Sequence, residues 1–104
     1  MIDENTIEFK TWFAGAQKIV ADYFKANYPT NSPTVLSFTL GHRYIKVIGT
    51  SYSQNSVWAF IDRTNGDVLK PASWNAPAKH ARGCLFDQSN GLSNLGPHGP
   101  NYLK

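Results

Sequence analysis

An aromatic stripe near the N-terminus limits what this chain can fold into. Large apolar side chains recur there at spacings of three and four residues, which places them on one face of a helix: Phe9, Trp12, Phe13, Ala16, Ile19, Val20, Tyr23 and Phe24. Asn5 and Glu8 resemble a capping box, and Tyr28-Pro29 would stop the helix, so we expect a helix over residues 6 to 27. Because an isolated helix is marginally stable in water, this wide apolar face must pack against a second layer.

Alternating segments downstream supply that second layer. Residues 35–40 and 44–48 alternate along the chain with the period of two that is typical of strands. We expect a polar loop at residues 49–55 and a third strand at residues 56–62. Asn65-Gly66 predicts a tight hairpin that leads into a fourth strand at residues 67–70. We therefore expect an α+β fold, in which the N-terminal amphipathic helix packs on a four-stranded antiparallel sheet spanning about residues 35–70.

From Pro71 onward the chain is rich in proline and glycine and has no long periodic run. We expect one short helix there, with Asn75 as its cap, residues 78–82 as its body and Gly83 as its end. The apolar side chains that remain in residues 71–104 favour an ordered strap and an irregular tail over disorder. A chain of 104 residues has room for a single domain, residues 1–104.

Composition excludes several classes of protein. Hydrophobic residues make up 41% of the chain and charged residues 16%, which excludes a globally disordered protein. No apolar run is long enough to cross a bilayer, and the first residues lack the features of a signal peptide, so we expect a cytoplasmic protein with no membrane partner. The lone cysteine, Cys84, excludes an intramolecular disulfide.

Positive charge is concentrated in the C-terminal part of the sequence. Residues 68–86 contain no acidic side chain, but they carry four basic side chains beside an indole: Lys70, Lys79, His80, Arg82 and Trp74. Cationic side chains of this kind pair with phosphates, and a flat indole stacks on a base. We therefore expect a binding site for an anionic, base-containing ligand here. The alternative is a structural strap with a buried Trp74 and solvated cations.

A second group of aromatic and basic residues lies on the predicted sheet. It comprises Tyr44, Tyr52 and Trp58, interleaved with His42, Arg43, Lys46 and Arg63. Tyr44 and Arg63 join the candidate site from this group, whereas Trp58, between Val57 and Ala59 in a predicted strand, is more typical of a core residue. If Tyr44, Lys46 and Arg63 line an exposed face, single-stranded nucleic acid becomes the alternative ligand.

The titratable side chains form no recognisable catalytic motif. His80 and Cys84 lie four residues apart, but Gly83 separates them, and Cys84 beside Leu85 is typical of a small core residue. His80, Cys84 and His98 are too irregularly spaced to predict a zinc site. Asp62 and Asp67 flank the Asn-Gly turn. Because Asp side chains bond to nearby backbone N–H groups at such turns, the turn explains the presence of both residues without a catalytic role. We therefore expect no enzymatic activity, no catalytic residue, no metal and no cofactor.

The block DRTNGDVLKPASWNAPAKHARG, residues 62–83, resembles a group of small uncharacterised proteins encoded by tailed bacteriophages. That resemblance implies a setting in the cytoplasm of an infected bacterium, where small phage proteins bind host proteins, nucleic acid or the nucleotide messengers of bacterial immunity. The corresponding hypothesis is a phage protein that sequesters a nucleotide-type ligand to counter host nucleotide-signalling immunity. The alternatives are a single-stranded nucleic-acid binder and an inhibitor of a host protein. Because small domains often build a pocket across a subunit boundary, we also expect a homo-oligomer.

Overall fold

The computed structural model describes residues 1–101, and the last three residues of the predicted tail lie outside the described part. It contains one helix, α1 (Ile7–Asn27), and a five-stranded antiparallel sheet. In spatial order the strands are β1 (Val35–Leu40), β2 (Tyr44–Ser51), β3 (Gln54–Asp62), β4 (Asp67–Pro71) and β5 (Pro77–Cys84). A short hairpin, β6 (Leu95–Gly96) and β7 (Gly99–Pro100), follows. The predicted α+β class is confirmed.

The helix has the predicted extent, but it begins differently from the prediction. Thr6, not Asn5, is the N-cap residue, and its hydroxyl accepts a hydrogen bond from the Asp3 N–H at 3.0 Å. The Asn5 N–H donates to the Asp3 carboxylate at 2.8 Å, so the predicted capping box between Asn5 and Glu8 is wrong. At the other end, the Tyr28 N–H closes the last turn by donating to the Phe24 carbonyl at 2.7 Å.

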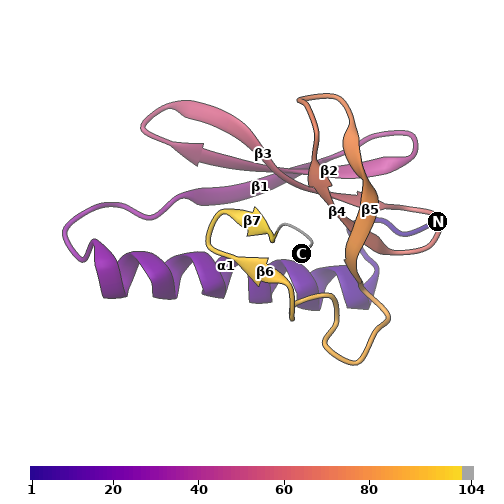
Figure 1. Ribbon diagram of the computed structural model, residues 1–104, viewed down its shortest axis with the longest axis horizontal. Helices are drawn as coiled ribbons and strands as arrows, with labels where there is room; N and C mark the ends of the chain where they lie inside the picture. Colours follow the sequence, from indigo (N-terminus) through magenta and orange to yellow (C-terminus); the bar gives the residue numbers. More distant parts are fainter. Residues whose placement is uncertain (102–104) are drawn as a thin grey trace.

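Helix α1 covers one face of the sheet (Figure 1). Its buried side chains are Phe9, Trp12, Ala16 and Val20, as the aromatic stripe predicts. They pack against inward-facing strand residues that include Leu36, Ile45, Val47, Ala59 and Ile61. Each fully buried large apolar side chain contributes about 1.5–3 kcal/mol relative to an exposed one, so this interface holds the two layers together.

Strands β2 and β3 are longer than predicted and leave no polar loop at residues 49–55. They are joined by a tight turn at Tyr52 and Ser53, whose φ angles are 51° and 66°. A β-bulge lies within the same pair of strands, because Val47 pairs with Ala59 while Ile48 pairs with Val57. The unpaired Trp58 turns toward α1, where its ring centre lies 6.1 Å from that of Trp12.

The short helix predicted within residues 75–82 is wrong, because this segment is the edge strand β5. Its register with β4 pairs Val68 with Gly83 and Leu69 with Ala81. The alanines and basic residues of the segment have good helix propensity, but the open edge of β4 offers a full set of backbone partners, and tertiary pairing overrides local preference. The sheet consequently has five strands and not four.

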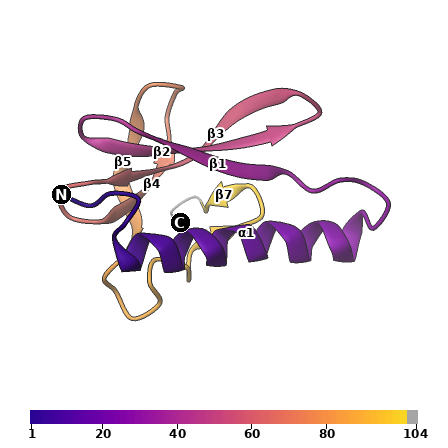
Figure 2. The ribbon, with the colours of Figure 1, turned by 180° about the vertical axis from the view of Figure 1, so that it is seen from behind.

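The C-terminal tail is ordered, as expected, but part of it forms the β6–β7 hairpin. Both views show this hairpin between α1 and the sheet (Figure 1, Figure 2). The Trp58 indole N–H donates to the Pro97 carbonyl at 3.3 Å, and the Lys70 ammonium donates to the Pro100 carbonyl at 3.0 Å. The hairpin therefore lies between the two layers, beside the core side chains that pack α1 on the sheet. Among residues 1–101, no helix combines the length and the apolar character needed to span a lipid bilayer.

Candidate functional site

The face of the sheet opposite α1 carries a cluster of aromatic and basic side chains, which we call the outer face. Side chains alternate along a strand, so Tyr44 and Lys46 lie opposite the inward-facing Ile45 and Val47. Phe60 is buried although it does not belong to the core beneath α1, and its ring centre lies 5.7 Å from that of Tyr44. The outer face is therefore built on an apolar floor.

The connection between β4 and β5 reaches over this outer face. Its tight turn is closed by the N–H groups of Ala72 and Ser73, which both donate to the Ala76 carbonyl at 3.0 Å. Trp74, at the tip, is 47% exposed, and the Lys46 ammonium lies 4.6 Å from the centre of its ring. This arrangement excludes the alternative of a Trp74 buried beneath a strap. Trp58, by contrast, is only 4% exposed and belongs to the core, as its sequence context predicts.

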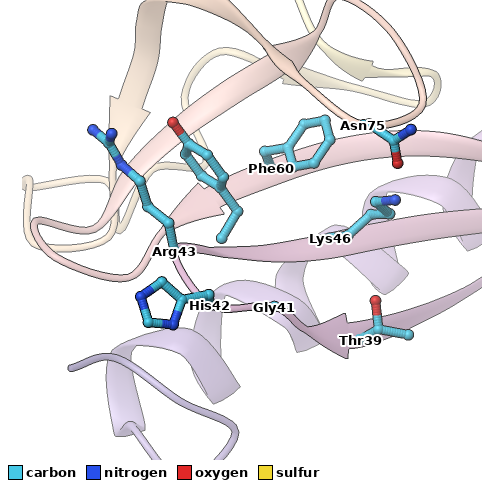
Figure 3. A pocket seen from close by; sticks show the side chains of 8 residues that line it. Thr39, Gly41, His42, Arg43, Lys46, Phe60 and Asn75 are labelled. Atoms are coloured by element: carbon cyan, nitrogen blue, oxygen red, sulfur yellow. The ribbon is translucent and has the colours of Figure 1, made fainter.

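A hollow of 210 Å³ lies on the outer face between β1, β2, β3 and the Trp74 turn (Figure 3). Its lining residues are Thr39, Gly41, His42, Arg43, Tyr44, Lys46, Phe60 and Asn75. In Figure 3, Lys46 and Asn75 lie toward one end of the hollow and Arg43 and His42 toward the other, with Phe60 between them. The lining contains two permanent cations, a histidine and no acidic side chain. An anion with a flat apolar portion matches this combination.

A second hollow, of 320 Å³, adjoins the first and shares Arg43 and Tyr44 with it. It extends toward β4 and β5, and its other lining residues are Asp62, Asn65, Asp67, Leu69, Pro77, Ala78 and Lys79. Because two carboxylates lie in this lining, the second hollow is electrostatically mixed. The first hollow is therefore the better site for a phosphate.

Asp62 organises the boundary between the two hollows. This residue is 4% exposed, and its carboxylate accepts hydrogen bonds from the Thr64 hydroxyl at 2.6 Å and from the Thr64 N–H at 2.9 Å. The Arg43 guanidinium lies 3.4 Å from its other oxygen. Burial alone would raise the pKa of Asp62, but the Thr64 hydrogen bonds and the Arg43 charge together lower this pKa below its usual value. Asp62 thus stays ionised and holds Arg43 at the rim, where the Arg43 guanidinium carbon lies 5.3 Å from the Tyr44 ring centre.

Three of the predicted site residues line neither hollow, and their cations bind backbone carbonyls. Lys70 donates to Pro100, and Arg82 donates to Asn101 at 3.2 Å and to His80. Arg63 donates to the Ile2 carbonyl at 2.7 Å and to the Gly41 carbonyl, which ties the N-terminus to the β1–β2 connection. These three side chains have structural roles in the folded chain.

The structure places Tyr44 in the lining of both hollows and Lys79 in the second, whereas Trp74 lies beside Lys46 but lines neither hollow. His80, the last of the seven predicted site residues, is exposed on edge strand β5 and lines neither hollow. The sequence analysis grouped His42, Arg43 and Lys46 with Tyr44 on the sheet but did not include them in the site, and it assigned Asn75 to a helix cap. The period of two in β2 puts Lys46 on the same side as Tyr44, and the structure adds that His42, Arg43 and Asn75 line the same hollow.

Cys84 and the histidines form no metal centre in the described part of the chain. Cys84 is half-buried, and its thiol lies 3.5 Å from the Asn65 carbonyl oxygen. His98 packs instead against the Tyr23 ring at 5.5 Å. No group of three His, Cys, Asp or Glu side chains within residues 1–101 could hold a metal ion.

Fold and site together define an α+β domain with a cationic, aromatic hollow on the sheet face that its helix leaves open. The chain belongs to DUF7717, a family of unknown function, which matches residues 6–96. No curated protein and no solved structure matches the chain.

Proposed function

We propose that this protein is a non-enzymatic binding protein that captures an anionic, base-containing ligand, most simply a nucleotide, on the outer face of its sheet. The observation that carries the proposal is the first hollow, where Arg43, Lys46 and His42 surround an apolar floor without any acidic side chain. The half-exposed Trp74 beside it provides a stacking surface. Phosphates and a base need these two features side by side.

Each part of such a ligand has a partner in this arrangement. The base stacks on Trp74, and the phosphates lie between Lys46 and Arg43. In the free protein the Lys46 ammonium covers one face of the Trp74 ring, so the base must stack on the opposite face or displace the ammonium. His42 and the Asn75 amide add hydrogen-bond donors at opposite ends of the hollow.

The biological setting of the proposal comes from the resemblance of residues 62–83 to tailed-bacteriophage proteins. In an infected bacterium, a protein that only binds a nucleotide acts by lowering its free concentration. Sequestration of a nucleotide messenger of host immunity is the role that fits a small protein that binds its ligand and does not transform it. Its place of action would be the host cytoplasm.

Single-stranded nucleic acid is the second candidate ligand, because the two hollows adjoin and share Arg43 and Tyr44. A strand of several nucleotides could cross both of them. Asp62 and Asp67 in the second hollow would repel its phosphates, which favours the smaller ligand. Inhibition of a host protein is the third candidate, and a protein that binds no nucleotide or oligonucleotide would point to it.

Titration calorimetry with mononucleotides, dinucleotides and short oligonucleotides tests the proposal. We expect Trp74→Ala to weaken nucleotide binding by about 5- to 150-fold, which corresponds to the roughly 1–3 kcal/mol of one stacked base. Lys46→Ala should weaken binding by about 10-fold or more, because it removes a charge-assisted hydrogen bond. Matched controls lie on other surfaces: Tyr52→Ala removes an aromatic ring that is 79% exposed, and Lys10→Ala removes an exposed cation from α1.

The controls should bind like the wild type. Equal losses in Trp74→Ala and Tyr52→Ala would contradict the assignment of the site, and no binding of any nucleotide by the wild type would contradict the function. Salt separates the two ligand classes, because affinity for an oligonucleotide falls steeply with salt concentration and affinity for a mononucleotide falls less.

A further inference from the structure

The two edges of the five-stranded sheet differ in how well they are protected. Edge strand β5 carries Pro77, Lys79, His80 and Arg82, and proline and charge discourage the addition of another strand. Edge strand β1, of sequence VLSFTL, has no charged residue and no proline. Its two end residues, Val35 and Leu40, are 64% and 42% exposed. The chain therefore leaves one neutral, apolar edge open.

The hydrogen-bonding groups on that open edge can be assigned from the β1–β2 register. The Gly41 N–H donates to the Tyr44 carbonyl at 2.9 Å, and the adjacent Leu40 pairs with Ile45. Inward and outward backbone groups alternate along an antiparallel ladder. Since the register runs without a break, the N–H and C=O groups of Leu36, Phe38 and Leu40 point away from β2. Among the described residues, β1 has no strand on that side.

Apolar surface accompanies these open backbone groups. The ring of Phe38 lies 5.0 Å from that of Phe9 and 5.1 Å from that of Phe13. Phe13 and Phe38 are only partly buried, although both pack against the core. A layer added beside β1 would cover what remains exposed of these two rings.

We propose that β1 pairs antiparallel with β1 of a second copy of this chain, about a two-fold axis at Phe38. The outward-pointing residues are placed symmetrically about Phe38, so Phe38 opposes its own copy and Leu36 opposes Leu40. This register pairs every outward N–H and C=O group of one strand with a group of the other strand. Both copies then use the same surface, as an isologous interface requires. The absence of charge in β1 allows the strand to meet its own copy without repulsion, whereas β5 would place cations opposite cations.

The same register has a consequence for the outer face. Ser37 and Thr39 are exposed there, and the two-fold axis places Ser37 of each copy opposite Thr39 of the other. Thr39 also lines the first hollow, so the hollows of the two copies would lie near each other on one continuous sheet face. The dimer itself is inferred from the edge of the sheet and does not depend on the proposed ligand.

Charge placed across the axis tests the proposal without touching the core. The wild type should sediment as a dimer in the absence of any ligand. S37K/T39K puts lysine opposite lysine at both crossings and should shift the protein to a monomer. S37K/T39E carries the same number of substitutions but puts opposite charges together, and it should remain a dimer. Circular dichroism of both variants confirms that they fold.

Amide hydrogen exchange gives an independent readout. We expect the N–H groups of Leu36, Phe38 and Leu40 to exchange more slowly in dimeric S37K/T39E than in monomeric S37K/T39K. A monomeric wild type would overturn the proposal. It would indicate that any strand that adds to this edge comes from another protein. Dimers in both variants would assign the interface to a different surface, and monomers in both would overturn the register centred on Phe38.

Discussion

At the scale of single residues, two carboxylates hold loops together through hydrogen bonds from the backbone. Asp62 binds Thr64 at the β3–β4 turn. Asp87 accepts hydrogen bonds from the Gly91 N–H at 2.9 Å, from the Ser89 hydroxyl at 2.8 Å and from the Cys84 N–H at 3.1 Å. The hydrogen bonds from Gly91 and Ser89 lower the pKa of Asp87 despite a small opposing effect of burial.

These lowered pKa values predict how stability depends on pH. A carboxylate whose pKa is lower in the folded chain stabilises the fold above its unfolded pKa of about 3.9, and this contribution is lost as the pH falls through the folded pKa. The free energy of unfolding should therefore begin to fall below about pH 5 and continue to fall below pH 4. Asp87→Asn should cost about 1 kcal/mol at pH 7 and reduce this pH dependence.

Urea unfolding at pH 7 and at pH 3 measures this effect. Asp22→Asn is the matched control, because Asp22 forms an exposed ion pair with Lys18 within α1, and exposed pairs of this kind contribute little to stability. If Asp87→Asn and Asp22→Asn showed the same loss of stability at pH 7 and the same pH dependence, the loop-organising role of Asp87 would be wrong.

At the scale of elements, the sequence predicted correctly those segments in which the spacing of apolar residues matches the face that is buried in the fold. The aromatic stripe of α1 and the alternation in β1 and β2 correspond to faces that are buried in the structure. β5 could not be recognised because its alanines and basic residues favour a helix, and only the neighbouring β4 makes it a strand. A strict period of two likewise does not predict the β-bulge at Trp58.

The candidate site could be predicted only in part for the same reason. Trp74 and Tyr44 carry a chemical signal in their own side chains, and both lie at the outer face. Lys70, Arg63 and Arg82 show the same cationic signal, but their partners are carbonyl groups of segments distant in the sequence. Which cations remain available to a ligand is decided by long-range hydrogen bonds that no local pattern records.

The β2–β3 turn supports a prediction at this scale. Tyr52 and Ser53 both have positive φ, which costs a residue with a Cβ about 1–2 kcal/mol. Asn-Gly is the preferred sequence for a two-residue hairpin turn of this kind. We therefore expect Y52N/S53G to raise the free energy of unfolding by about 1 kcal/mol, measured by urea denaturation.

The Asn65-Gly66 turn of the same sheet provides the opposite control. Gly66 has a φ of 85°, and an added Cβ would lie 2.7 Å from the Phe86 ring, so Gly66→Ala should destabilise the fold. Y52N/S53G variants that are no more stable than the wild type would show that the backbone strain in the β2–β3 turn is negligible.

At the scale of the whole molecule, the β6–β7 hairpin joins the helix layer to the sheet layer. It contacts α1 through β6 and contacts β3 and β4 through β7. Trp58 and Lys70 both donate hydrogen bonds to its carbonyl groups from the sheet. The hairpin lies on the α1 side of the sheet (Figure 2), whereas the lining of the proposed ligand site lies on the outer face (Figure 3). Stability and binding should therefore be separable by substitution.

Two glycines of this hairpin allow that separation to be measured. Gly99 has a φ of 111°, and a Cβ added to it would overlap the Trp58 carbonyl oxygen, which is fixed backbone. Gly99→Ala should therefore lower the free energy of unfolding by about 3 kcal/mol or more. A Cβ on Gly96 would meet the Asn101 side chain at 3.0 Å, and that side chain can move, so Gly96→Ala should cost less than about 1 kcal/mol.

Urea unfolding measures both values, and nucleotide titration of the folded fraction at low temperature should give wild-type affinity for both variants. A weakened affinity in Gly99→Ala alone would mean that the hairpin shapes the outer face through the sheet, and equal stabilities would mean that the layers are held together without it.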